Sequence, residues 1–121
     1  MSVREMVATL GGVQRSIPKA LEGALYEFAN IEMTEMKERT PVEFNTLRSS
    51  GQVDLPKWTG DVLGITLGFG GAAESYAFWV HEDLEAFHSV GQAKFMESVL
   101  YESEPYFEQR IGNSFARRMG L

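Results

Sequence analysis

The apolar positions between residues 16 and 39 recur at intervals of three and four, which is the spacing of one face of an α-helix. The members of this apolar face are Ile17, Leu21, Ala24, Leu25, Phe28, Ile31 and Met36. Ser16 suits the N-cap and Pro18 suits the first turn, where a missing N–H costs little. Thr40 precedes a proline, and that position disfavours helical geometry. The pattern therefore predicts a helix of about six turns that begins at Ser16 and ends near Arg39.

The chain before this helix contains adjacent glycines, Gly11 and Gly12, which argue against helical structure there. We expect residues 1–15 to form a flexible N-terminal arm. No internal repeat or low-complexity linker divides the remainder, so residues 16–121 are predicted to form one domain.

Three later stretches alternate apolar residues with polar or small ones, which is the pattern of strands with one buried face. These stretches are Gln52–Lys57, Val62–Phe69 and Ser75–Glu82. In the second stretch, Gly64, Thr66 and Gly68 occupy the face opposite the large apolar residues. Turn residues around Gly60 and Gly70 leave only short connections, so we expect an antiparallel meander.

Helical spacing returns after residue 90 and is interrupted by Pro105. The positions that mark the two segments are Gln92, Met96, Val99 and Leu100, then Tyr106, Phe107, Ile111, Phe115 and Met119. Ser103 is a candidate cap for the second segment. The order of elements predicts an α+β fold. It has a long N-terminal helix, a three-stranded antiparallel meander, and one or two C-terminal helices packed on the sheet.

Composition and charge narrow the class of protein. The chain has 121 residues, 44% of them apolar and 23% charged, which is ordinary for a globular domain. Its apolar runs are shorter than the roughly 18–20 residues of a membrane span. The first 15 residues carry Glu5 and lack an apolar core, so no signal peptide is expected. The absence of cysteine excludes disulfides and thiolate metal sites, and it fits a cytosolic site of synthesis.

The net charge is −6, from 11 basic and 17 acidic residues. The basic residues are scattered, apart from Arg117 and Arg118 near the end. Binding to nucleic acid needs clustered basic residues that neutralise phosphates, so a nucleic-acid-binding surface is not expected. An acidic surface that DNA passes without adhering is compatible with this charge.

The only two histidines, His81 and His88, lie among the carboxylates Glu82, Asp83 and Glu85. His81 and Glu82 are adjacent on a predicted strand, so their side chains leave opposite faces and do not readily share a metal. A metal site built from His81, Asp83 and His88 would make the protein a small metal-assisted hydrolase, and this is the alternative function. The simpler interpretation is two partly exposed histidines beside a turn.

No catalytic nucleophile is indicated, because Ser49 and Ser50 precede a glycine without the G-x-S-x-G pattern. The glycines of the second strand are not in a phosphate-binding loop between a strand and a helix. We therefore predict no catalytic, metal or cofactor-binding residues, and a role as a subunit whose aromatic and glycine-rich surfaces meet neighbours. A third hypothesis is a host-directed binding module, such as an inhibitor that mimics DNA by its acidity. We rank it last, because the acidic residues are spread through the chain and form no phosphate-like row.

Three stretches in fixed order carry a resemblance: KERTPVEFNTLRSSG at 37–51, YAFWVHE at 76–82 and VGQAKFMESVL at 90–100. Together they resemble the neck, or head–tail joining, family of tailed bacteriophages, whose members are described as tail-completion or minor tail components. The family pattern after the first helix is usually Thr-Pro-Val-Asp-Thr-Gly-x-Leu-Arg-x-Ser. This chain departs from it at Glu43, Phe44 and Asn45. It keeps Thr40, Pro41, Val42, Leu47, Arg48 and Ser50.

The second and third stretches also match the family's patterns. The matching residues are Tyr76, Ala77, Trp79, Val80, His81 and Glu82, then Ala93, Lys94, Phe95 and Met96. At the departure in the first stretch, Asn45 tolerates the left-handed backbone that a glycine would take. At Phe44 the family pattern usually has threonine.

The resemblance implies a structural virion protein and not an enzyme. It implies a cyclic ring of six or twelve copies in the neck, made in the host cytoplasm. The implied neighbours are portal, adaptor or head-closure proteins on one side and tail terminator or tail tube proteins on the other. DNA would pass without specific binding, and no membrane would be involved. The residues expected to serve packing or subunit contacts are Arg48, Trp79, His81 and Phe95.

Overall fold

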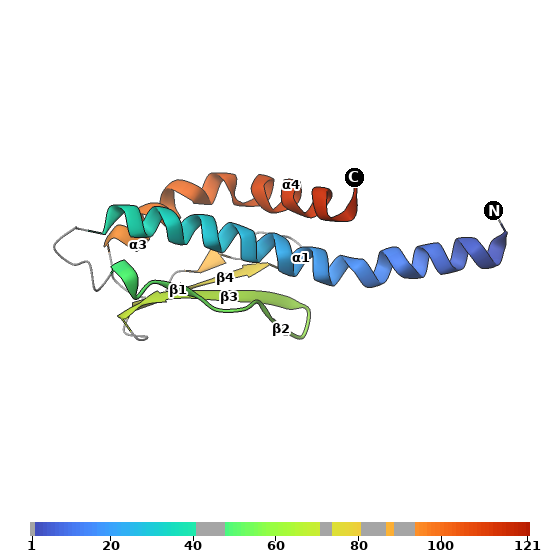
Figure 1. Ribbon diagram of the computed structural model, residues 1–121, viewed down its shortest axis with the longest axis horizontal. Coiled ribbons are helices and arrows are strands. Elements are labelled where there is room, and N and C mark those ends of the chain that lie inside the picture. The colour runs from blue at the N-terminus through green and yellow to red at the C-terminus, as the bar shows by residue number, and fades with distance from the viewer. Residues whose placement is uncertain (1, 41–47, 71–73, 81–86, 89–93) are drawn as a thin grey trace.

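Helices lie on one face of an antiparallel sheet in the computed structural model (Figure 1). The structure describes residues 2–40, 48–70, 74–80, 87–88 and 94–121. Its elements in chain order are α1 (Val3–Arg39), β1 (Gln52–Val53), β2 (Lys57–Thr59), β3 (Val62–Phe69), β4 (Glu74–Val80), β5 (Phe87–His88), α3 (Lys94–Ser103), the 3₁₀ turn η3 (Glu104–Tyr106) and α4 (Phe107–Met119). The predicted α+β class, with a long N-terminal helix and an antiparallel sheet, is confirmed.

Strand β3 lies at the centre of the sheet and pairs antiparallel with β4 on one edge. On its other edge β1 and β2 pair with successive parts of the same strand. The prediction of a single strand over Gln52–Lys57 is therefore wrong, because the structure has two short strands there, β1 and β2. A proline at position 56 lies between the two pieces, and proline cannot donate a hydrogen bond to a strand ladder. Strand β5, which the sequence did not predict, pairs with β4 through Ala77 and His88.

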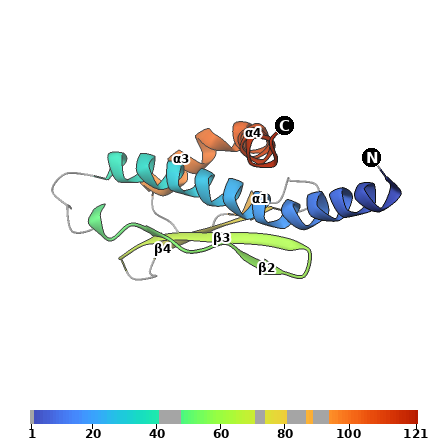
Figure 2. The ribbon, with the colours of Figure 1, turned by 45° about the vertical axis from the view of Figure 1, so that its right-hand side comes forward.

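The core lies between the sheet and the helices. Along β3 the large apolar residues are buried, whereas Val62, Gly64, Thr66 and Gly68 on the other face are half-buried. This is the alternation that the sequence predicted. The buried core residues are Ala24, Leu25, Phe28, Ala29, Met33, Met36, Leu63, Ile65, Leu67, Phe69, Met96, Val99, Leu100, Phe107 and Ile111. Figures 1 and 2 show all the labelled helices above the sheet.

Helix α1 begins at Val3, so the prediction that it begins at Ser16 is wrong. Its first turn has a reciprocal capping box in which the Glu5 N–H donates to Ser2 Oγ at 3.1 Å and the Ser2 N–H donates to Glu5 Oε2 at 3.0 Å. The adjacent glycines and Pro18 therefore lie inside the helix. Its end at Arg39, with Thr40 as an extended cap, agrees with the prediction.

The C-terminal helical segments are separated at Pro105, as predicted, by the short turn η3. Ser103 precedes this turn but makes no side-chain capping bond, so its predicted role as a cap is wrong. Helix α4 lies beside α1, where Phe28 and Phe107 meet edge to face with ring centroids 4.9 Å apart. It ends at Gly120, whose φ of 77° is the left-handed geometry of a helix C-terminus.

Candidate functional site

Two of the four predicted contact residues make contacts within the chain. Arg48 donates from Nη2 to the carbonyl oxygen of Thr40 at 2.8 Å, which ties the segment after α1 to the end of that helix. The ring of Phe95 meets Phe69 edge to face, with centroids 5.1 Å apart. Arg48 and Phe95 therefore contribute to internal packing, and their contact with a neighbouring subunit stays a prediction.

Of the other predicted residues, Trp79 lies in β4 and His88 in β5. The Cα of Trp79 is paired with that of Gly64, in the middle of the sheet. His81 and Asp83 lie outside the described residues, and His88 is placed only by its backbone pairing with Ala77. The hydrolase site therefore stays a prediction. Within the described part of the chain, no group of three or more histidines and carboxylates could hold a metal ion.

A buried carboxylate, which the sequence analysis missed, joins three helices. Glu32 on α1 is only 1% exposed. Ser103 Oγ on α3 donates a hydrogen bond to Glu32 Oε2, and Arg110 Nη1 on α4 lies 3.3 Å from Glu32 Oε1. Burial raises the pKa of Glu32 above its ordinary value, while the Ser103 hydrogen bond and the Arg110 charge act in the opposite direction.

The Glu32 junction borders a hollow of about 260 Å³. A carboxylate with a raised pKa beside a hydroxyl has the elements of acid–base chemistry. Ser103 Oγ, however, is also within 2.8 Å of the Val99 carbonyl oxygen, and its residue is buried. Glu32 and Ser103 are both buried, so neither is readily accessible to a substrate. Their contacts mainly hold the three helices together. The sequence signal for this junction is spacing, because Glu32 is four residues after Phe28 and four before Met36 on the buried face.

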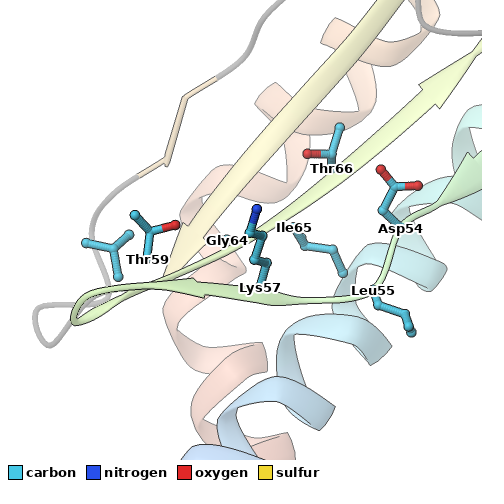
Figure 3. A pocket seen from close by; sticks show the side chains of 8 residues that line it. Asp54, Leu55, Lys57, Thr59, Gly64, Ile65 and Thr66 are labelled. Atoms are coloured by element: carbon cyan, nitrogen blue, oxygen red, sulfur yellow. The ribbon is translucent and has the colours of Figure 1, made fainter.

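The outer face of the sheet carries no described helix (Figures 1 and 2). It has a shallow pocket of about 210 Å³, shown in Figure 3. Side chains of β2, of β3 and of the segment between β1 and β2 surround it: Asp54, Leu55, Lys57, Thr59, Val62, Gly64, Ile65 and Thr66. We give the name outer sheet face to this surface without Ile65, which is buried in the core, and with the addition of Gly68. Two of its positions on β3, Gly64 and Gly68, have no side chain.

The N-terminal part of α1 extends beyond the rest of the molecule (Figures 1 and 2). We call residues 3–19 the projecting segment, because every residue in it is exposed or half-buried and Ala20 is the first buried residue of the helix. Its exposed large apolar residues, the apolar stripe, are Val3, Met6, Val7, Leu10, Val13 and Ile17. An uncovered apolar stripe on a helix is typical of a surface that contacts another molecule.

Comparisons with protein-family models, with curated proteins and with solved structures found no match for this chain. No helix among the described residues is both long enough and apolar enough to cross a membrane. The candidate functional site is therefore defined by the chain's own geometry. It consists of the apolar stripe and the outer sheet face.

Proposed function

We propose that the protein is a structural protein of the neck of a tailed bacteriophage. In this proposal it forms a ring that joins, or completes, the connection between the DNA-filled head and the tail. The observation that carries the proposal is the ordered resemblance of residues 37–51, 76–82 and 90–100 to head–tail joining proteins.

The geometry of the chain supports an assembly role. A closed ring of identical subunits needs two different surfaces on each copy, because each contact is made between unlike faces. The apolar stripe and the outer sheet face are two such surfaces, and they lie on different elements. An uncovered apolar surface on a small domain is expected where another molecule binds.

The proposal places six or twelve copies in the virion, between the portal or head-closure proteins and the tail terminator or tail tube. The chain carries a net charge of −6, so a ring has a large negative charge that repels the DNA backbone. DNA would then pass through the ring without specific binding. The protein would act by contact with its neighbours, without catalysis or a cofactor.

Deletion of the gene in the phage that encodes it tests this function. We expect filled heads and separate tails that fail to join, and restoration of infectious particles when the gene is supplied on a plasmid. Electron microscopy of the lysate distinguishes joined from unjoined particles. Normal infectious particles from the deletion strain would falsify the proposal.

A further inference from the structure

We propose that copies of this chain associate head to tail, with the apolar stripe of one copy packed against the outer sheet face of the next. The inference rests on the proposed ring, and it specifies which two surfaces form the contact between subunits. It commits to a second copy of the chain as the molecule that covers the apolar stripe.

The apolar stripe continues the face of α1 that packs in the core. Val3, Leu10 and Ile17 are seven residues apart, and the next position in this series is the buried Ala24. Met6 and Val13 form a second series that leads to the buried Ala20. This three-four spacing keeps one face of a helix apolar over its whole length. The same face therefore packs on a sheet in its second half and is uncovered in its first half.

The projecting segment needs an external contact for its stability. Glycine costs about 1 kcal/mol relative to alanine inside a helix, and the segment contains Gly11 and Gly12. Pro18 cannot donate the helical hydrogen bond to the carbonyl of Gln14. The capping box at Ser2 contributes only about 1 kcal/mol. Because helix stability in proteins comes mainly from packing of the apolar face, burial of the stripe would supply the missing stabilisation.

The part of the outer sheet face that β3 forms leaves room for the close approach of a helix. Gly64 and Gly68 lie on β3 with Thr66 between them, so over these three positions β3 contributes only backbone and one small side chain to the face. Glycine inside a strand is often found where another backbone approaches closely. Leu55, which is 77% exposed, supplies an uncovered apolar side chain at the border of the same face. The stripe would bury this leucine together with its own residues.

The charge distribution favours contact between unlike parts of two copies. The projecting segment carries three basic residues, Arg4, Arg15 and Lys19, and one acidic residue, Glu5, for a formal charge of +2. The whole chain carries −6, so the remainder carries −8. The attraction is between the basic segment and the acidic body of a neighbour as a whole, because the charges of Asp54 and Lys57 on the outer sheet face cancel. Two projecting segments, in contrast, repel each other.

Pairing of two projecting segments is the competing arrangement. It would close as a symmetric dimer and leave the outer sheet face uncovered. Head-to-tail contact covers both surfaces and continues from copy to copy until a ring closes. The proposed arrangement is therefore the one that accounts for both uncovered surfaces.

Matched charge insertions test each surface in the purified full-length chain. Leu10→Glu places a charge in the stripe, and Leu55→Glu places one at the outer sheet face. The controls are Ala8→Glu on the opposite side of the projecting segment and Tyr101→Glu on α3, both at exposed positions. We expect Leu10→Glu and Leu55→Glu each to raise the dissociation constant for self-association at least about tenfold, as measured by sedimentation velocity over a concentration series. The controls should associate like the parent chain.

Circular dichroism and thermal unfolding of the monomers verify that each variant is folded. All four positions are exposed, so the fold should be retained. Self-association that survives Leu10→Glu, or a parent chain that stays monomeric up to about 1 mM, contradicts the inference.

Cysteine cross-linking identifies which surfaces meet, because the chain has no cysteine of its own. A chain with Leu10→Cys and Thr66→Cys should give a ladder of covalent oligomers with a short thiol cross-linker. A mixture of the two single variants should give the mixed dimer. Efficient cross-linking of Leu10→Cys alone to itself would instead establish paired projecting segments and overturn the proposal.

These results are separable from the test of the proposed function. Head-to-tail cross-links in a chain whose deletion leaves phage infectious would support the contact and reject the neck function. Unjoined heads and tails in the deletion strain, together with a purified chain that does not form the head-to-tail contact, would support the function and reject the contact.

Discussion

The two halves of α1 share one apolar spacing but have different surroundings. Leu25 in the second half is 0% exposed between the sheet and the C-terminal helices, whereas Leu10 in the first half is 65% exposed. A hydrophobic period therefore identifies which face of a helix is apolar, but it does not identify what covers that face. Leu25 is covered by residues that are distant from it in the chain. For Leu10 the cover would come from another molecule.

The largest expected effect is a difference in the free energy of unfolding between two leucine-to-alanine variants, one in each half of α1. Leu25→Ala should lower the free energy of unfolding by about 2–5 kcal/mol, because it opens a cavity in the core. Leu10→Ala should change it by less than about 0.5 kcal/mol in the monomer, because the side chain is exposed. Urea denaturation at a concentration where the chain is monomeric measures both values. Equal losses in the two variants would show that Leu10 is covered within one chain.

Two glycines, Gly51 in the folded body and Gly12 in the projecting segment, allow the same comparison of covered and uncovered regions. A Cβ on Gly51 would lie 2.7 Å from Phe69 Cε1, 2.8 Å from Lys37 Cε and 2.8 Å from Met33 Sδ. Gly51→Ala should therefore destabilise the fold by about 1–3 kcal/mol through overpacking. A Cβ on Gly12 meets no atom within 4 Å, so Gly12→Ala should instead strengthen the helix, by about 0.5–1 kcal/mol.

Denaturation midpoints and the helical signal in circular dichroism measure the effects of Gly51→Ala and Gly12→Ala. Gly51→Ala should unfold at a lower denaturant concentration with unchanged helix content. Gly12→Ala should increase the helical signal without loss of stability. A destabilising Gly12→Ala would mean that the projecting segment packs closely against another part of the same chain.

The smallest of these effects concerns two carboxylates in the covered half of the helix. Burial raises the pKa of Glu32, so the folded protein holds this proton more tightly than the unfolded chain does. Stability from this group is present below the ordinary pKa of about 4.3 and is lost as the pH rises through the raised value. Glu32→Gln mimics the neutral form. It should therefore match or exceed the parent chain in stability at pH 7, by about 1 kcal/mol at most, and remove this part of the pH dependence.

Glu27 provides the control of opposite sign. Hydrogen bonding from Ser114, followed by the interactions with Arg117 and Arg118, lowers its pKa despite partial burial. Its contribution is present above the ordinary pKa and is lost as the pH falls through the lowered value. Glu27→Gln should thus reduce stability slightly at pH 7, since the carboxylate is partly exposed. Unfolding free energies measured from about pH 2 to pH 8 should separate the two variants, and parallel pH profiles would contradict both assignments.

Much of the fold could be predicted from local patterns. The period of β3, the end of α1 at Arg39 and the interruption at Pro105 each follow from a local steric or periodic rule, and each agrees with the structure. The start of α1 was predicted wrongly, because two glycines were given more weight than the capping pair of Ser2 and Glu5. The capping pair was visible in the sequence.

The buried Glu32 junction and the outer sheet face were harder to predict than the fold. Glu32 has the spacing of a buried residue, but its partners Ser103 and Arg110 are distant in the chain, at separations of 71 and 78 residues. The outer sheet face likewise depends on which side of the sheet the helices cover. Alternation along β3 gives two faces, and it does not state which of them stays uncovered.

The sequence by itself determined the helical and strand periods, the turns, the acidic net charge and the apolar face of α1, because these depend on neighbours along the chain. Tertiary structure alone decided that the first part of that apolar face, from Val3 to Lys19, extends past the sheet while the rest is buried. The physical reason is that burial depends on packing between distant segments. The length of the sheet and the positions of α3 and α4 set where the cover over α1 ends.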